Sequence, residues 1–218
     1  MTPQFISFEG GEGAGKSTQI ALLSAWLEQQ KVDHIITREP GGSAGAELIR
    51  DLLVKGATDR WEPMTEALLM TASRTEHIHR TILPALAAGK WVLCDRFFDS
   101  TIAYQGAARG LGMDSMRQLQ TLAFGDVAPH ITFFLNIPVV EGLMRARGRE
   151  GDKQLENTRE DRFERMDTSF HEALHDGFVR LTEQEPERIK MINASKSISD
   201  IQADIRGYFH QILNNADG

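Results

Sequence analysis

The fold is decided by the stretch Gly10-Gly11-Glu12-Gly13-Ala14-Gly15-Lys16-Ser17, which matches the pattern G-x-x-x-x-G-K-[ST]. An apolar run over residues 5–8 precedes this stretch, and apolar residues recur at helical spacing after it. A strand, a glycine-rich loop and a helix in this order direct backbone N–H groups and a positive helix end toward phosphate. A glycine-rich turn without a ligand is the alternative, but the flanking elements favour a nucleotide-binding loop.

The residue types of this loop predict distinct roles in holding a nucleoside triphosphate. The Lys16 ammonium would reach the β- and γ-phosphates, and the Ser17 hydroxyl would bind Mg²⁺. We predict phosphate contacts for Gly10, Gly11, Glu12, Gly13, Ala14, Gly15, Lys16, Ser17 and Thr18. Nucleotide binding alone does not define an activity, and the sequence holds no guanine-reading N-K-x-D motif of regulatory GTPases.

Short apolar runs alternate with longer segments of helical period along the rest of the chain. The runs predict strands at residues 5–8, 34–37, 91–95, 131–136 and 189–192. Because each run is nearly continuous in apolar character, both faces of the sheet should be covered. We therefore predict a P-loop α/β fold, with a five-stranded parallel sheet between helices, in a single domain over residues 1–218.

Three further features of the chain's organisation can be predicted. Ser43 should cap a helix that buries Ile49, Leu52 and Leu53. Pro84 implies a kink or a break in the helical segment over residues 66–88. Residues 106–112 contain three glycines and suggest a loop.

Composition limits the classes of function. The net charge is −7, with 31 acidic against 24 basic residues, so the chain is a poor general partner for nucleic acid. Its single cysteine, Cys94, lies in an apolar run and is expected to be buried and inert. No targeting segment and no membrane-spanning stretch is visible, which suggests a cytoplasmic protein.

Asp95-Arg96 directly follows the third predicted strand. The carboxyl ends of parallel strands line the ligand crevice, so this pair should face the phosphate loop. Asp95 could hold a metal ion through water, and Arg96 could bind a phosphate with its planar fork. A structural ion pair at a strand end is the alternative.

Several motifs together resemble the thymidylate kinases. Residues 95–106, DRFFDSTIAYQG, resemble that family's D-R-[YFH]-x-x-S-x-x-A-Y-Q-G segment, and residues 37–42, TREPGG, match another of its motifs. Ser73-Arg74 matches its helical arginine, and residues 160–164, EDRFE, resemble its D-R-x-E lid core. The resemblance covers most of the chain in the family's order and spacing.

This resemblance implies roles for residues in binding dTMP. Arg38 and Arg96 would hold its phosphate, while Arg74 and Thr101 would contact thymine. Tyr104 would pack under the sugar and Glu12 would approach the 3′-hydroxyl, although Tyr104 could be a core aromatic and Glu12 a solvated loop charge. The implied dTMP site comprises Glu12, Arg38, Pro40, Met70, Arg74, Arg96, Ser100, Thr101, Tyr104 and Gln105.

The sequence departs from the family pattern at two positions. Met70 stands where many members have a phenylalanine that stacks on thymine, although a thioether can also pack against a ring. Phe178 stands where relatives often have tyrosine, so a hydroxyl role is absent there.

The composition of the charged segment over about residues 147–165 favours a solvated helix or tail, whereas the resemblance implies a mobile lid. Family members without an arginine in the phosphate loop carry the catalytic arginine in the lid, and this loop has none. Arg162 is the first candidate, followed by Arg147 and Arg149. The implied catalytic set is Lys16, Asp95, Arg96 and Arg162, with Mg²⁺ held by Ser17 and, through water, by Asp95.

The resemblance implies an enzyme that transfers the γ-phosphoryl group of ATP to dTMP, giving dTDP for dTTP synthesis, and that acts as a homodimer. A kinase for another nucleotide or nucleoside is the nearest alternative. A P-loop binding or regulatory protein without phosphotransfer is the alternative from another class.

Overall fold

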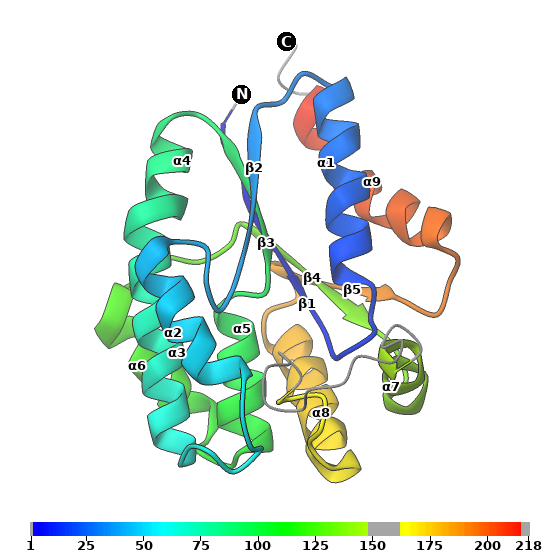
Figure 1. The fold of residues 1–218 in the computed structure, drawn as a ribbon. Coiled ribbons are helices and arrows are strands. Elements are labelled where there is room, and N and C mark those ends of the chain that lie inside the picture. Colours follow the sequence, from blue (N-terminus) through cyan, green and yellow to red (C-terminus); the bar gives the residue numbers. More distant parts are fainter. Residues whose placement is uncertain (1, 148–161, 215–218) are drawn as a thin grey trace.

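The computed structural model describes residues 2–147 and 162–214, which form a five-stranded sheet in the order β2-β3-β1-β4-β5 (Figure 1). All neighbouring strands are parallel. The strands are β1 (Phe5–Glu9), β2 (His34–Arg38), β3 (Trp91–Asp95), β4 (Ile131–Asn136) and β5 (Ile189–Asn193). The five predicted strands are therefore confirmed, and β1, β2 and β5 each extend one residue beyond the predicted end.

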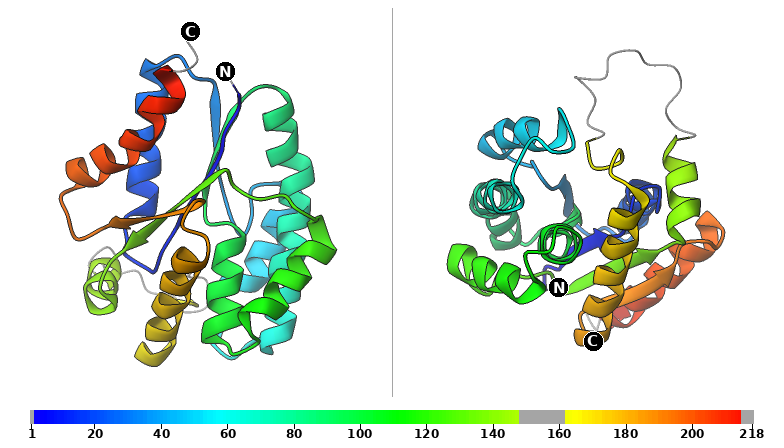
Figure 2. Two further views of the ribbon diagram at one scale, coloured as in Figure 1. Left: turned by 180° about the vertical axis from the view of Figure 1, so that it is seen from behind. Right: turned by 90° about the horizontal axis from the view of Figure 1, so that it is seen from below.

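Helices cover both faces of the sheet (Figures 1 and 2). Two of the helical segments, η1 and η2, are π-helices. The helical elements are α1 (Lys16–Gln29), α2 (Ala44–Val54), α3 (Pro63–His77), η1 (Ile78–Ile82), α4 (Leu83–Ala87), α5 (Phe98–Thr101), η2 (Ile102–Ala108), α6 (Met113–Phe124), α7 (Val139–Arg147), α8 (Thr168–Gln184) and α9 (Ile198–Asn214).

The two faces of the sheet carry separate cores. Ile6 and Phe8 of β1 pack in the core formed with α1 and α9, whereas Phe5 packs in the core on the opposite face. Phe178 of α8 belongs to that second core and stacks on Phe134 with ring centroids 5.1 Å apart. Alternate residues of one strand thus enter different cores, which explains why each strand is apolar throughout.

The structure corrects two local predictions. Ser43 caps α2 as predicted, because its hydroxyl accepts from the Ala46 N–H at 3.3 Å, but only Leu53 of the three expected core residues is fully buried. Leu52 is 39% exposed, since α2 packs on α3 through the face that carries Ala46 and Leu53. Gly106 is not in a loop, because η2 continues to Ala108 and the turn begins after it.

The expected break at Pro84 is a change of helix type. Helix α3 passes into the π-helix η1 and then into α4, where Pro84 occupies the first turn. Proline is tolerated there because an N–H at that position needs no partner within its own helix.

The carboxyl ends of β1 and β3 meet at one edge of the sheet, where the loop over residues 10–15 joins β1 to α1. Residues 148–161 of the expected lid lie outside the described residues. Among the helices that the structure describes, none combines the length and apolar character needed to cross a bilayer.

Candidate functional site

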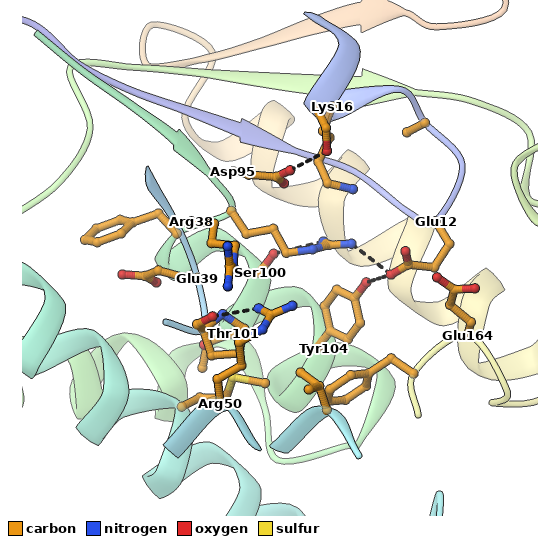
Figure 3. Close-up of a pocket in the computed structure, with 18 of the residues that line it drawn as sticks. Glu12, Lys16, Arg38, Glu39, Arg50, Asp95, Ser100, Thr101, Tyr104 and Glu164 are labelled. Atoms are coloured by element: carbon orange, nitrogen blue, oxygen red, sulfur yellow. Dashed lines mark hydrogen bonds and ion pairs between the residues drawn. The ribbon is translucent and has the colours of Figure 1, made fainter. Parts of the chain in front are cut away.

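A single cavity of about 480 Å³ joins the phosphate loop to a group of arginines and aromatic residues (Figure 3). It opens at the carboxyl ends of the central strands, where ligands bind in parallel α/β sheets. Most of the predicted site residues line it: Glu12, Gly13, Ala14, Gly15, Lys16, Ser17, Thr18, Arg38, Pro40, Met70, Arg74, Asp95, Arg96, Ser100, Thr101, Tyr104 and Gln105. Sequence motifs more than 80 residues apart thus converge on one space.

The phosphate loop has the backbone geometry that its glycines allow. Gly13 and Gly15 adopt left-handed φ angles of 69° and 90°, which other residues reach only with strain. The Lys16 ammonium donates to the carbonyls of Gly10 and Gly11, each at 3.2 Å. Burial, followed by the positive charge of Arg96, lowers the pKa of Lys16. An anion bound at the loop would offset both effects.

Ser17 and Asp95 bring two oxygen ligands together beside the loop. The Ser17 hydroxyl donates to Asp95 Oδ2 at 2.9 Å. Hydroxyl and carboxylate oxygens are the ligands that Mg²⁺ prefers, so this pair fits the metal role predicted for both residues.

Arg96 occupies a strained backbone position at the centre of the cavity. Its φ of 68° lies in the left-handed region, which disfavours a residue of this bulk. Two hydrogen bonds fix the backbone there: the Arg96 N–H donates to the Phe8 carbonyl at 2.9 Å, and the Phe97 N–H donates to Glu9 Oε1 at 2.7 Å. Burial and the nearby Asp99 carboxylate raise the pKa of Glu9 to about 7.

The Arg96 guanidinium links the phosphate loop to Tyr104. It donates to Glu12 Oε1 at 2.9 Å and lies over the Tyr104 ring, 5.1 Å from its centroid. The Tyr104 hydroxyl donates to the same Glu12 oxygen at 3.1 Å. Burial would raise the pKa of Glu12, but the charges of Arg96 and Lys16 outweigh burial and lower it.

The structure shows how the Glu12 and Tyr104 side chains are placed. Glu12 is a partnered carboxylate rather than a solvated loop charge. Tyr104 belongs to the core, with edge-to-face contacts to Phe163 and Phe170, while its hydroxyl reaches into the cavity. Tyr104 is thus both a core aromatic and a cavity residue.

Arg74 and Met70 line the end of the cavity that lies away from the phosphate loop. Arg74 is 3% exposed, and it donates to Thr101 Oγ1 at 2.9 Å. Arg38 is more open than Arg74 and Arg96, with its side chain 55% exposed and paired with Glu47 at 3.1 Å.

Sequence reasoning missed Arg50, whose guanidinium donates to the Pro40 carbonyl at 2.7 Å. Its spacing in α2 is a usable signal, because Arg50 lies four residues after buried Ala46 and three before buried Leu53, on the inward face. The missed lining residues are Glu39, Arg50, Val54, Phe97, Ala146, Phe163 and Glu164.

Arg162, the first candidate for the lid arginine, does not line the cavity. Its guanidinium is fully buried, pairs with Glu66 at 2.6 Å and donates to the carbonyls of Leu53, Ala57 and Thr58 at 3.2, 2.9 and 3.0 Å. These contacts tie the chain at Arg162 to the end of α2 and to the connection between α2 and α3. In this structure these partners hold Arg162 outside the cavity, and its catalytic role stays a prediction.

The phosphate loop, the strand order and the joined cavity define a P-loop nucleotide-binding protein with a second, arginine-lined subsite. The family model described as thymidylate kinase matches residues 8–205. This chain is 48% identical over 203 residues to a thymidylate kinase of Rhizorhabdus wittichii, covering 93% of this chain and 95% of the relative. It is also 48% identical over 201 residues to a thymidylate kinase of Caulobacter vibrioides, covering 92% and 93% respectively.

A crystal structure of thymidylate kinase from Ehrlichia chaffeensis is similar in fold, with a TM-score of 0.75 and 31% sequence identity, covering 96% of this chain and 99% of that chain. The chain belongs to the thymidylate kinase family.

Proposed function

We propose that this protein transfers the γ-phosphoryl group of ATP to dTMP. The observation that carries the proposal is the joined cavity, in which the phosphate loop and the arginine-lined subsite share one space with Arg96 between them. A protein that only bound a triphosphate would have no use for the second subsite. Membership of the thymidylate kinase family identifies dTMP as the acceptor.

The donor binds at the loop. Its phosphates accept from the loop N–H groups, and Lys16 leaves the carbonyls of Gly10 and Gly11 to reach them. Ser17, and Asp95 through water, would hold Mg²⁺, which would neutralise charge on the phosphates.

The acceptor binds at the other end. Arg38 and Arg96 hold the dTMP phosphate, which needs no general base because it is already ionised at neutral pH. The thymine ring lies against Met70 and accepts from Arg74, close to Thr101. Ser100, Gln105 and Pro40 complete the walls of this subsite.

Tyr104 and Glu12 contact the acceptor sugar. The Tyr104 ring stands where a 2′-hydroxyl would lie, so deoxyribose is favoured, and the Glu12 carboxylate accepts from the 3′-hydroxyl. The hydrogen bond between the two side chains supports this arrangement, since it holds both at the mouth of the same subsite.

Lys16, Arg96 and a lid arginine supply the positive charge that stabilises the negative charge on the transferring phosphoryl group. Because Arg162 forms a buried ion pair with Glu66, we assign the role of the catalytic lid arginine to the remaining candidates, Arg147 and Arg149. Substitution of each by alanine distinguishes them, since loss of such an arginine lowers kcat by about 10³-fold or more.

A homodimer is supported by apolar side chains exposed on the neighbouring helices α2 and α3. Leu48, Leu52, Met64 and Leu68 are 73, 39, 47 and 51% exposed. Such a patch is typical of a protein interface. Sedimentation equilibrium should give twice the mass of the chain, and Leu48→Asp should shift it to the monomer mass. A chain that sediments as a monomer at micromolar concentration contradicts the assignment.

The activity is tested by measuring ADP formation from ATP and Mg²⁺ with dTMP, dUMP and the ribonucleoside monophosphates in turn. We expect strong selectivity for dTMP, and near-complete loss of activity in Lys16→Ala but not in the control Lys55→Ala, where the half-buried lysine pairs with Asp51 outside the cavity. Selectivity for another monophosphate would support the alternative kinase. ATP binding without acceptor-dependent turnover would support the regulatory alternative.

A further inference from the structure

Four polar groups form a continuous buried chain that ends at the thymine side of the cavity. Thr37 at the end of β2 contacts His77 at the end of α3, with Oγ1 and Nε2 2.6 Å apart. The other ring nitrogen of His77, Nδ1, lies 2.9 Å from Glu39 Oε1. The second oxygen of Glu39 accepts from Arg74 Nε at 2.6 Å.

The side chains of this chain are buried, so each depends on its protein partners for hydrogen bonds. His77 is 0% exposed, and Glu39 and Arg74 are 5% and 3% exposed. A buried polar group that loses its partner is costly, because no water replaces the lost bond. The members of this chain must therefore keep their orientations together.

The donors can be assigned from the chemistry of the groups. An ionised carboxylate only accepts, so His77 Nδ1 carries the proton that it donates to Glu39. In the neutral ring, Nε2 then accepts from the Thr37 hydroxyl. The ring thus orients one carboxylate oxygen of Glu39 while Arg74 occupies the other.

The surrounding backbone prevents the His77 ring from turning away. A Cβ atom on Gly42 would lie 2.4 Å from His77 Nε2 and 2.6 Å from Thr37 Oγ1, so the glycine backbone packs directly against this pair. The Gly42 carbonyl is itself held by the Thr81 hydroxyl at 2.7 Å. The loop after β2 therefore encloses the histidine.

At the other end of the chain, the Arg74 guanidinium is held in one plane. Besides Glu39, it donates to Thr101 Oγ1 at 2.9 Å and to the Phe97 carbonyl at 3.1 Å, and it lies 5.4 Å from the centroid of the Phe97 ring. A guanidinium has five N–H donors, so these bonds leave capacity for an acceptor in the cavity that Arg74 lines.

We propose that His77 is a positioning residue for acceptor recognition. Through Glu39, it fixes the direction in which Arg74 presents its remaining donors to the base of the acceptor. This inference rests on the proposed function, because it assumes that a nucleotide base occupies the Arg74 end of the cavity. His77 itself does not line the cavity.

The test compares His77→Phe, which keeps a ring but removes both hydrogen bonds, with His77→Asn, whose amide can still donate to Glu39. His34→Phe is the matched control, since His34 lies on the same strand as Thr37 but bonds Ser24 and the Val32 carbonyl, away from the cavity. Steady-state kinetics give KM and kcat for dTMP, dUMP and ATP, and thermal unfolding gives Tm for each variant.

In His77→Phe we expect the KM for dTMP to rise by about 10-fold or more, the effect of losing a bond to a charged group, with the KM for ATP unchanged. His77→Asn should recover part of this loss, and His34→Phe should leave both KM values unchanged. An unchanged KM for dTMP, or equal changes for dTMP and ATP, would overturn the inference.

If His77→Phe does not fold, Thr37→Val tests the inference instead, because it removes only the hydroxyl that begins the hydrogen-bonded chain. We expect a rise of about 3-fold in the KM for dTMP, and no change would overturn the inference. Failure of the proposed function is seen separately, as a wild-type enzyme without preference for dTMP.

Discussion

Replacement of Arg162 by methionine should destabilise the fold and leave the chemical step largely intact. Arg162 and Glu66 are both fully buried and 2.6 Å apart, so the substitution leaves a carboxylate inside the protein without its main partner. Breaking a buried ion pair from one side typically costs about 3–5 kcal/mol. Arg109 and Gln105 still contact Glu66 at 3.2 and 2.8 Å, which favours the lower end of that range.

The double variant separates the ion pair from the rest of the change. Adding Glu66→Gln to Arg162→Met removes the unpaired charge, so it should recover part of the lost stability. Urea unfolding of the wild type, both single variants and the double variant gives the coupling energy directly. For a chain of this size, a loss of about 3 kcal/mol corresponds to a decrease in Tm of roughly 6–12 °C.

Arg80→Ala is the control for Arg162→Met. Arg80 pairs with Glu76 at 3.6 Å on the surface, with 74% of its side chain exposed, so its loss should cost less than about 1 kcal/mol. kcat is measured at saturating substrates well below Tm. Wild-type stability in Arg162→Met combined with a fall in kcat of about 10³-fold would refute the structural assignment and restore the catalytic one.

Three further predictions concern other parts of the site. The pKa of Glu9 is raised in the folded state from 4.5 to about 7, so its stabilising contribution is complete below pH 4.5 and is lost as pH rises through 7. Unfolding at a series of pH values should show the wild type losing up to roughly 3 kcal/mol over this range relative to Glu9→Gln. Gly142→Ala places a Cβ 2.6 Å from the Glu12 carbonyl, so the phosphate loop must shift and the KM for ATP should rise by about 10-fold. Arg50→Met removes the bond to the Pro40 carbonyl and should raise the KM for dTMP by about 10-fold.

Each of these predictions has an outcome that contradicts it. Parallel stability curves for the wild type and Glu9→Gln would show that Glu9 titrates normally. An unchanged KM for ATP in Gly142→Ala would mean that α7 moves away without disturbing the loop. Equal effects of Arg50→Met on the KM for ATP and for dTMP would remove its assignment to the acceptor subsite.

The sheet could be predicted from sequence because its physical cause is local. A strand buried on both faces, such as Ile131–Asn136, must be apolar at nearly every position, and that pattern is visible without any knowledge of its neighbours. The phosphate loop could be predicted for the same reason, since its glycines and lysine act within eight consecutive residues. The exposure of side chains on helices is harder to predict, because it depends on which helix packs against them. Leu52, which was expected to be buried, is 39% exposed for this reason.

The contacts of Arg162 could not be predicted from sequence because its partners are distant in the chain. Its carboxylate partner, Glu66, is 96 positions earlier in the chain, and its backbone acceptors lie at the end of α2 and in the connection that follows. The chain of Thr37, His77 and Glu39 is hidden for the same reason: residues of β2, of α3 and of the loop after β2 come together only after folding. Motifs identify residues that contact ligands. The residues that hold those side chains in place can be recognised only in the folded structure.

Direct passage of a phosphoryl group from donor to acceptor within one cavity is what the proposed function requires. It is tested most directly by incubating the protein with Mg²⁺, dTMP and ATP labelled in the γ-phosphate, then separating the products by chromatography. We predict that the label appears in dTDP, with one dTDP formed for each ADP. Label released as inorganic phosphate, or ADP formed without dTDP, would contradict the account.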